Sequence, residues 1–588
     1  MRWTVGLVAF LVMACSGCGG SSSPPPADGD AGGDADADSD ADADGDAGPA
    51  VDESVRLYEP ERVIEVSIEM SDEDAEALRL QTRDPNSMLE GDDCLSEPFP
   101  SPFTYFPATV TVDGETVENV GVRKKGLLGS LSETKPSLKV DFGEYVADRE
   151  LFGVEKLTLN NSLSDPSYVR QCLGYALFAE AGVPAPRCNF AHVVANGHDL
   201  GLYVNLESMG KDFLRRHFDD EDGNLYEGTL SDFRAQWVGS FDNKDADALD
   251  FGDLGEAVGA LESPDGALLD ALDPVFDVDQ FLTYWAMEIL TAHVDGYASN
   301  TNNFFVYHDP TSDRFVFMPW GIDATFYGQN PFGGNHASVY ATGILARRLY
   351  LFPESRDRYL ERLRDLLDAV WDEDGIVEQI DRMEEIITPV ADPDGAVGVA
   401  GAVQGVRDFV RAQRGRILGE IDGRDPPEWT EPLRDPPCFV NIGTASGTFA
   451  TTFGTVGAED PFAAGSGTFD AEVDGEALGV VAVASESGWD PNNPGLPVVL
   501  VIGALDDGTV AIGYFPVTDP ATFVAGARFS LGLGGSWAAL VSLEPATGEM
   551  SQIGLLLNGE LALDEGAIED GAVVSGSFTA DIIRFPWL

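Results

Sequence analysis

A proline-rich break divides the chain into two parts of different composition. Residues 426–437 read PPEWTEPLRDPP, and so many prolines cannot continue a helix or a central strand. The part that follows, residues 438–588, contains no Lys and only two Arg, Arg528 and Arg584, although the whole chain has 35 Lys and Arg. We therefore interpret residues 426–437 as a linker between two separately packed parts.

The part after the linker has the pattern of an all-β domain. It is rich in Gly, Val, Ala and Thr, in short apolar or alternating runs such as GVVAVAS, VVLVIGAL, TVAIGYF and GSFTADI. Short runs of this kind, separated by turn residues, predict a β-sandwich or barrel over residues 438–588. No cluster of catalytic residue types occurs in it, and its role stays open between binding and packing.

The N-terminus carries an export signal. Residues 1–18 read MRWTVGLVAFLVMACSGC, with Arg2 before an apolar run too short to span a bilayer. The run also resembles a bacterial lipoprotein signal, in which the Cys after a small residue is lipidated: Cys15, with Cys18 as the alternative. We expect an exported protein, lipid-anchored to a bacterial membrane at the outer membrane or cell surface.

An acidic low-complexity segment follows over residues 19–55. It carries ten Asp and no Lys or Arg between Ser21 and Asp52, in a chain of net charge −66. Self-repulsion and the lack of apolar residues predict an extended tether. A chain this acidic repels nucleic acid and anionic lipid, so the membrane contact expected is the lipid anchor alone. It suits a basic partner, divalent cations or simply solubility.

Four further cysteines, Cys94, Cys172, Cys188 and Cys438, permit disulfides in an exported protein. Four cysteines allow three pairings, and the sequence does not choose among them. Their spacing fits no zinc pattern.

Residues 56–425 mix helix and strand signals, so this part is expected to be α+β. Hairpins are expected at Asp113-Gly114, at Asn196-Gly197 and over residues 302–321. Strands are expected over 63–70 and 137–142, and helices after Ser71, over 165–182 and 277–292, and across 354–423.

The stretch HVDGYASN, His293–Asn300, lies between an apolar helix and a hairpin. Its H-x-D-x-x-x-x-N spacing is that of a protein kinase catalytic loop, and Asp323 follows the hairpin as a kinase's metal-binding Asp does. Phosphoryl transfer needs one carboxylate at the incoming hydroxyl, and an amide oxygen and a second carboxylate at the metal. The hairpin would bring Asp295, Asn300 and Asp323 to one edge.

Five motifs in order over about residues 62–420 resemble the CotH kinase family. They are GVRKKGLLGS with KPSLKVDF, LFGVEKLTLNNSLSDPSYVRQCLGYALFAEAGVPAPR, NGHDLGLYVNLE with GNLYEG, DGYASNTNNFFVY, and FMPWGIDATF. The resemblance implies an atypical protein-kinase-like two-lobed domain over residues 56–425, followed by the all-β domain. It also implies binding of ATP with Mg²⁺ or Mn²⁺ and phosphorylation of protein Ser or Thr.

The resemblance assigns roles to individual residues. Asp295 would orient or deprotonate the substrate hydroxyl, and Asn300 and Asp323 would bind the metal. A larger set is implied in nucleotide contacts: Lys139 or alternatively Lys135, then Arg123, Lys124, Lys125, Glu207 and Trp320.

Structural roles compete with these assignments. Asp295 could cap a turn, since Asp-Gly is a common turn pair. Lys139 could face solvent, Trp320 could be a core residue, and His293 is expected to support the loop. Two departures from the family pattern stand out: a Gly-Leu-Leu-Gly-Ser turn at residues 126–130, and Gly321 where the family often has the first Asp of Pro-Trp-Asp-x-Asp.

The sequence thus predicts an exported CotH-like kinase acting on a protein substrate, with a basic, Ser-rich one as the expected class and no nucleic acid partner. Two alternatives stay open: a non-catalytic surface binding protein on a kinase-like scaffold, and another nucleotide-dependent transferase. ATP is scarce outside the cytoplasm, so the phosphoryl donor is open too.

Overall fold

The computed structural model describes residues 52–584 apart from 61, 84–87, 92, 128–129, 245–250, 329, 331–335, 394–397, 424, 492–494, 533–537 and 546. The predicted export signal with Cys15 and Cys18 lies outside the described residues, as does the acidic segment up to residue 51. Across the described ranges, no helix combines the length and apolar character that a membrane span requires.

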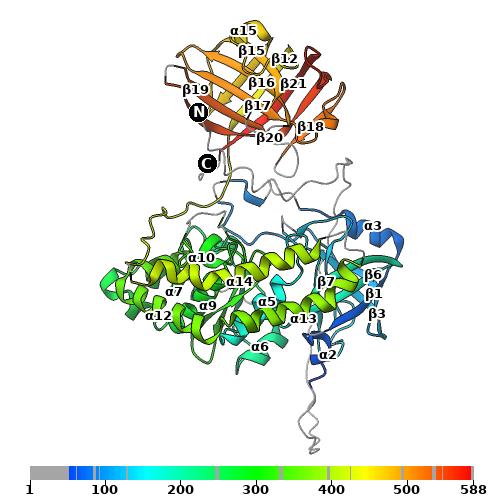
Figure 1. Ribbon diagram of the computed structural model, residues 1–588, viewed down its shortest axis with the longest axis vertical. Helices are drawn as coiled ribbons and strands as arrows, with labels where there is room; N and C mark the ends of the chain where they lie inside the picture. The colour runs from blue at the N-terminus through cyan, green and yellow to red at the C-terminus, as the bar shows by residue number, and fades with distance from the viewer. Residues whose placement is uncertain are drawn as a thin grey trace, which may run out of the picture.

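Seven alternating apolar–polar strands close into an N-terminal barrel (Figure 1). In barrel order they are β1 (Val63–Glu69), β2 (Phe106–Val112), β3 (Glu115–Lys125), β4 (Ser137–Asp141), β5 (Lys156–Asn160), β7 (His198–Glu207) and β6 (Cys188–Ala195). β1 pairs in parallel with β6 and closes the ring. Asp113 and Asn196 turn the two predicted hairpins with φ of 49° and 47°, the left-handed conformation that such tight turns need.

Three helices accompany the barrel: α2 (Val55–Tyr58), α3 (Asp72–Leu80) and α5 (Arg170–Glu180). Ser71 caps α3 by accepting a hydrogen bond from the Asp74 amide, as its sequence predicts. The helix expected over 165–182 begins only at Arg170, because Asp165 folds a turn: its carboxylate accepts hydrogen bonds from the backbone amides of Ser167 and Arg170.

A second, largely helical part surrounds a four-stranded sheet of order β11-β10-β8-β9. Its strands are β8 (Leu225–Gly228), β9 (Asp242–Asn243), β10 (Phe304–Asp309) and β11 (Arg314–Pro319). Its helices are α6 (Lys211–His217), α7 (Gly252–Leu261), α8 (Leu268–Leu272), α9 (Val278–Leu290), α10 (Tyr297–Asn300), α11 (Ile344–Leu351), α12 (Pro353–Ala369), α13 (Glu373–Ala391) and α14 (Val399–Ile421), with short 3₁₀ turns at Val238–Ser240 and Asp265–Ala267. Every residue of α9 except Asp279 and Gln280 is buried, and Trp285 stacks on Tyr359 of α12.

The C-terminal part is one curled antiparallel sheet of ten strands (Figure 1). Its elements are β12 (Val440–Thr452), α15 (Pro461–Ala464), β13 (Ser466–Val473), β14 (Glu476–Ala477), β15 (Val480–Trp489), β16 (Pro497–Leu505), β17 (Val510–Pro516), a 3₁₀ turn at Pro520–Thr522, β18 (Arg528–Leu531), β19 (Ala538–Glu544), β20 (Glu549–Glu565) and β21 (Val573–Arg584). The edge strand β15 lies against β12 and β13, so the sheet wraps around a core of its own that includes Phe449, Phe515 and Phe578.

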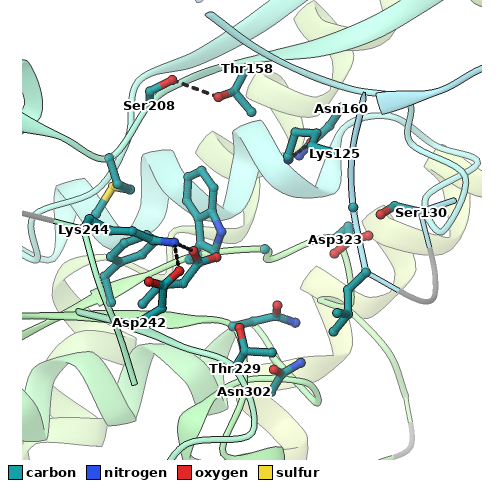
Figure 2. A pocket seen from close by; sticks show the side chains of 18 of the residues that line it. Lys125, Ser130, Thr158, Asn160, Ser208, Thr229, Asp242, Lys244, Asn302 and Asp323 are labelled. Carbon is teal, nitrogen blue, oxygen red and sulfur yellow. Dashed lines mark hydrogen bonds and ion pairs between the residues drawn. The ribbon is translucent and has the colours of Figure 1, made fainter. Parts of the chain in front are cut away.

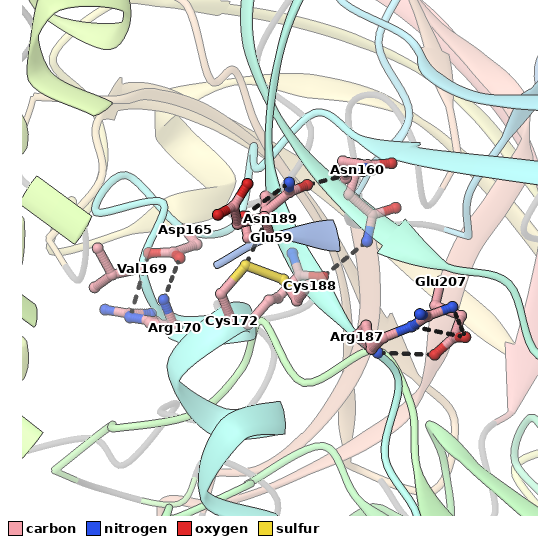
Figure 3. The surroundings of a disulfide bond; sticks show 12 residues. Glu59, Asn160, Asp165, Val169, Arg170, Cys172, Arg187, Cys188, Asn189 and Glu207 are labelled. Carbon is pink, nitrogen blue, oxygen red and sulfur yellow. Dashed lines mark hydrogen bonds and ion pairs between the residues drawn. A yellow bond between two sulfur atoms is a disulfide. The ribbon is translucent and has the colours of Figure 1, made fainter. Parts of the chain in front are cut away.

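Two disulfides are present among the described residues. Cys172–Cys188 joins α5 to β6 (Figure 3), and Cys94–Cys438 joins the segment before β2 to the start of the C-terminal part. This is one of the three pairings that the sequence left open.

The predicted mixture of helix and strand and the β-rich C-terminal region are confirmed. The kinase-like two-lobed arrangement stays a prediction.

Candidate active site

One large cavity collects most of the residues that the sequence singled out. It has a volume of about 1430 Å³ and is lined by strands β3, β4, β5 and β7 of the barrel, by β8 to β10, and by the loops before β10 and after β11. Eleven Lys or Arg and ten Asp or Glu line it, whereas the whole chain has 35 against 101. The cavity is therefore far more basic than the rest of the molecule, which favours an anionic ligand.

The loop after α9 is shaped by a buried glutamate. Glu288 is fully buried, and its carboxylate accepts hydrogen bonds from the Tyr284 hydroxyl and from the backbone amides of Tyr297 and Ala298. His293 packs beside Glu288, fully buried and away from the cavity lining. The loop is held from inside the protein, so its polar side chains are free to face the cavity.

Asp295 is held by three asparagine amides. Asn300 and Asn302 donate side-chain hydrogen bonds to its Oδ1 at 2.6 and 3.3 Å, and Asn303 donates to its Oδ2 at 2.7 Å. Such a ring of donors orients a carboxylate without neutralising it. Burial raises the pKa of Asp295, while the hydrogen bond from Asn300 opposes that rise.

Asp323 lines the same cavity (Figure 2). Burial, and then the negative charge of Asp295, raise the pKa of Asp323 to about 6. Two neighbouring half-buried carboxylates, one of which raises the pKa of the other, form a place where a cation is stabilised. No cation of the described residues forms an ion pair with Asp323.

The local geometry at Gly321, where the family resemblance predicts an Asp, favours glycine. Gly321 has φ +52°, and a Cβ built on it would lie 2.7 Å from Oδ1 of Asn303. A side chain at 321 would therefore push on the amide that holds Asp295. In this chain, Asn303 and Gly321 fit as a pair.

Lys139 faces the cavity from β4 and is surrounded by other cations. Burial, and then the nearby charges of Arg123, Lys156 and Lys244, lower its pKa to about 7, while Glu227 opposes them. Cations that lie close together with few opposing charges repel one another, and a bound anion would reduce that repulsion. The solvent-exposed alternative for Lys139 does not fit its half-buried place in the cavity wall.

Three other predicted nucleotide contacts also line the cavity: Lys125, Arg123 and Trp320. Lys125 donates to Asn160 Oδ1 at 2.5 Å and lies over the Trp320 ring. Figure 2 shows Lys125, Asn160 and Asp323 at one side of the cavity, with the Lys244–Asp242 ion pair at the other. Burial lowers the pKa of Lys125 to about 8.

The remaining predicted contacts have structural partners. Lys135 lies outside the cavity lining and donates to the Tyr168 hydroxyl and the Leu202 carbonyl. Lys124 is buried and donates to the carbonyls of Arg79 and Gln81. Glu207 borders the cavity, but both of its oxygens are engaged by Arg187 and Arg216. Figure 3 shows the pair with Arg187.

Sequence reasoning missed several residues of the site. Glu227 on β8 lies in the cavity wall and pairs with Lys244 at 2.5 Å; the GNLYEG motif that contains Glu227 was the available signal. Asn302 and Asn303 lie within the DGYASNTNNFFVY motif, but the kinase spacing singled out Asn300 alone. Arg434 lies in the predicted linker and lines the cavity, and no pattern around it indicated a site residue.

The residues present fit a metal bound together with a phosphate ligand. No group of three or more His, Cys, Asp or Glu side chains suited to a metal occurs in the described ranges. Mg²⁺ in phosphate-transfer sites is usually held by one or two carboxylates, with water and phosphate oxygens completing the shell. Asp323, which lies near Asp295 and forms no ion pair with the described residues, supplies a carboxylate of this kind.

Residues 122–411 match the family model described as CotH kinase protein. This region, just under half of the chain, is similar to the CotH kinase family. The chain is 25% identical over 256 residues to inner spore coat protein H of Bacillus subtilis, covering 40% of this chain and 69% of that protein. It is 21% identical over 268 residues to invasin CotH2 of Rhizopus delemar, covering 41% of this chain and 45% of that protein.

Two solved structures are also similar at low scores. The proinflammatory kinase CtkA of Helicobacter pylori is 9% identical, with a TM-score of 0.26 over 58% of this chain and 96% of that one. A HipA, HipB and operator DNA complex of Shewanella oneidensis gives a chain 10% identical, with a TM-score of 0.29 over 61% of this chain and 74% of that one. These scores are too low to establish a shared fold.

The CotH kinase region includes Asp295, Asn300, Asp323 and Lys139. The cavity wall also uses residues beyond that region: the segment 89–103, with Leu89, Phe99 and Phe103, and the segment 431–437, with Arg434. Residues inside and outside the matched region together form this site.

Proposed function

We propose that this chain is a phosphotransferase of the CotH kinase type, which transfers phosphate from ATP with Mg²⁺ or Mn²⁺ to a Ser or Thr hydroxyl of a protein. The observation that carries the proposal is the convergence of Asp295, its asparagine amides and the unpaired Asp323 in a cavity rich in cations. The family assignment supports a kinase-like protein; the donor, the metal and the acceptor are part of the proposal.

Each group has a task in such a transfer. Asp295, fixed by Asn302 and Asn303, would accept the proton of the attacking hydroxyl and orient its oxygen. Lys139 and Lys125 would bind phosphate oxygens from the barrel side, and Lys139 would become fully charged as the anion binds. Asp323 would hold the divalent cation, which supplies charge neutralisation at the phosphates.

The protein substrate and location are proposed from charge and from the N-terminal sequence. A chain of net charge −66 would favour a basic segment around the accepting Ser or Thr. The predicted export signal would place the protein at a bacterial surface, held by a lipid at Cys15 or Cys18. The donor there would be released ATP, or phosphorylation would precede export.

Labelled ATP tests the proposal directly. The full chain is incubated with labelled ATP and Mg²⁺ or Mn²⁺, alone and with a basic Ser-rich protein. Wild-type transfer is expected, and Asp295→Asn should reduce it by about 10²–10⁴-fold, the contribution of a positioned base. Mass spectrometry of the product separates a gained phosphate from a gained nucleotide.

Two half-buried lysines provide a matched pair for nucleotide binding. Lys139→Met removes a cation that faces the cavity, whereas Lys135→Met removes a cation bonded to Tyr168 and Leu202 outside it. Calorimetry should show weaker metal–ATP binding for the first variant alone. No label transfer and no nucleotide binding by the wild type would overturn the proposal in favour of a binding scaffold.

A further inference from the structure

The linker after the CotH kinase region crosses the cavity as a fixed strap, defined here as residues 425–437. Its carbonyl oxygens at Pro427, Glu431 and Arg434 accept hydrogen bonds from Tyr350, Arg347 and Arg234, at 2.8, 2.7 and 2.7 Å. Trp429 is buried in the core of the helical part. The strap therefore forms part of the cavity wall, although its sequence predicts a linker.

The strap places one side chain on the predicted metal site. Arg434 donates from Nη1 to Asn300 Oδ1 at 2.5 Å and approaches the Asn300 carbonyl at 3.4 Å. Asn300 in turn donates from Nδ2 to Asp295. Both ends of the Asn300 amide are thus engaged, its oxygen by a cation and its nitrogen by a carboxylate, and these two partners set its orientation.

This arrangement disagrees with a metal at Asn300. In protein kinases the catalytic-loop Asn and a second Asp together hold two Mg²⁺ ions. Here a divalent cation at Asn300 Oδ1 would share that single oxygen with a guanidinium, and two cations at such range repel strongly inside a protein. The positive charge that a metal would bring to Asn300 is already supplied by Arg434.

We propose that Arg434 is a fixed cation in the place of the second metal ion, so that the site takes one divalent cation, at Asp323. The inference rests on the proposed function and makes it more specific. Arg434 is a positioning residue: it acts on Asp295 through Asn300. It lies outside residues 122–411, so this device belongs to the strap of this chain.

The Cys94–Cys438 disulfide holds the device in place. Cys438 follows the strap directly and is bonded to Cys94, and Phe439 exchanges backbone hydrogen bonds with Leu89 and Gly91. Breaking this disulfide should let the strap move without changing any group in the cavity. It therefore offers a second route to the same test.

Counting bound Mn²⁺ tests the proposal. The full chain is titrated with Mn²⁺, with and without a non-hydrolysable ATP analogue, and free Mn²⁺ is followed by electron paramagnetic resonance. Arg434→Met should gain one Mn²⁺ site, and its affinity for Mn²⁺ should be at least tenfold higher than any binding that the wild type shows at Asn300. Arg434→Lys, which keeps the charge, should bind as the wild type does.

A double variant separates this site from the many acidic groups of the surface. Adding Asn300→Ala to Arg434→Met should abolish the gained site, because the gained ion would need Asn300 Oδ1. The Mn²⁺ binding of the Cys94→Ala/Cys438→Ala protein should shift from that of the wild type toward that of Arg434→Met. Thermal melting curves confirm that each variant is folded.

Three results would overturn the inference: an unchanged Mn²⁺ count in Arg434→Met, a lower count, or a gain that survives Asn300→Ala. Failure of the wild type to bind the nucleotide would instead overturn the proposed function. In that case, the difference in bound Mn²⁺ between the wild type and Arg434→Met, measured without nucleotide, still decides the role of Arg434.

Discussion

Asn303 occupies the space that a side chain on residue 321 would need, and the same Asn303 donates a hydrogen bond to Asp295. The glycine that departs from the family pattern is thus coupled to the orientation of the proposed base. It also adopts a left-handed backbone conformation, in which a non-glycine residue costs about 1–3 kcal/mol.

Gly321→Ala should therefore lower both stability and activity. We expect a loss of about 1–3 kcal/mol in the free energy of unfolding, and reduced label transfer because Asn303 is displaced from Asp295. Thermal melting and the transfer assay measure the two effects. Gly328→Ala is the control, since a Cβ at 328 meets nothing within 4 Å; equal behaviour of the two variants would contradict the coupling.

Nucleotide binding should depend on pH at both ends of the neutral range. Asp323, with a pKa of about 6, must be deprotonated to hold the metal, so affinity should fall as the pH drops through 6. Lys139 has a pKa of about 7, and a bound anion would raise it. The loss of the Lys139 proton should therefore lower the affinity for nucleotide as the pH rises above 7. Together the two groups place the highest affinity between about pH 6 and 7.

Calorimetry between pH 5 and 9 measures this profile. Lys139→Arg keeps its charge throughout the range, so the decline above pH 7 should shrink in that variant while the decline below pH 6 remains. The titration of the nucleotide itself is common to both proteins. A wild-type profile identical to that of Lys139→Arg would remove Lys139 from the anion site.

Glu207→Gln should affect stability more than catalysis. Glu207 is buried and pairs with Arg187 and Arg216, so its loss leaves Arg216 without its counter-charge and Arg187 with only the exposed Asp52, at 3.4 Å. We expect a loss of about 2–4 kcal/mol in the free energy of unfolding, measured by urea titration. Glu76→Gln, in an exposed ion pair with Arg79, should change little. Intact stability with lost nucleotide binding would instead support a nucleotide contact by Glu207.

The strap should become sensitive to trypsin when its disulfide is removed. Arg434 is held in the cavity wall, and Cys94–Cys438 anchors the end of the strap. In the Cys94→Ala/Cys438→Ala protein, cleavage after Arg434 should accelerate several-fold, as mass spectrometry of the fragments would show. Removing Cys172–Cys188 should leave that rate unchanged, and an unchanged rate in both proteins would mean that the disulfide does not secure the strap.

Local patterns predicted much of the framework. The hairpin turns at Asp113-Gly114 and Asn196-Gly197 and the Ser71 cap depend on residues within a few positions, and the structure contains them. The grouping of Asp295, Asn300 and Asp323 at one cavity follows from the order of helix, loop and hairpin. Their chemical roles stay predictions.

Long-range contacts could not be predicted from the sequence, for physical reasons. Cys94 and Cys438 are separated by 344 residues, and no local signal reports such a pairing. Arg434 was hidden because prolines mark linkers, yet carbonyl groups between prolines can accept hydrogen bonds and fix a segment. The late start of α5 arose from the side chain of Asp165, which competes with the helix for backbone amides.

The C-terminal sheet is joined to the rest of the molecule by two covalent routes, the strap itself and the Cys94–Cys438 bond. Tension applied to that sheet is carried at Cys438 into the segment before β2, so the strap between Asp425 and Pro437 is shielded from the load. A pull on the C-terminal sheet therefore leaves the guanidinium of Arg434 on Asn300 for as long as that disulfide is intact.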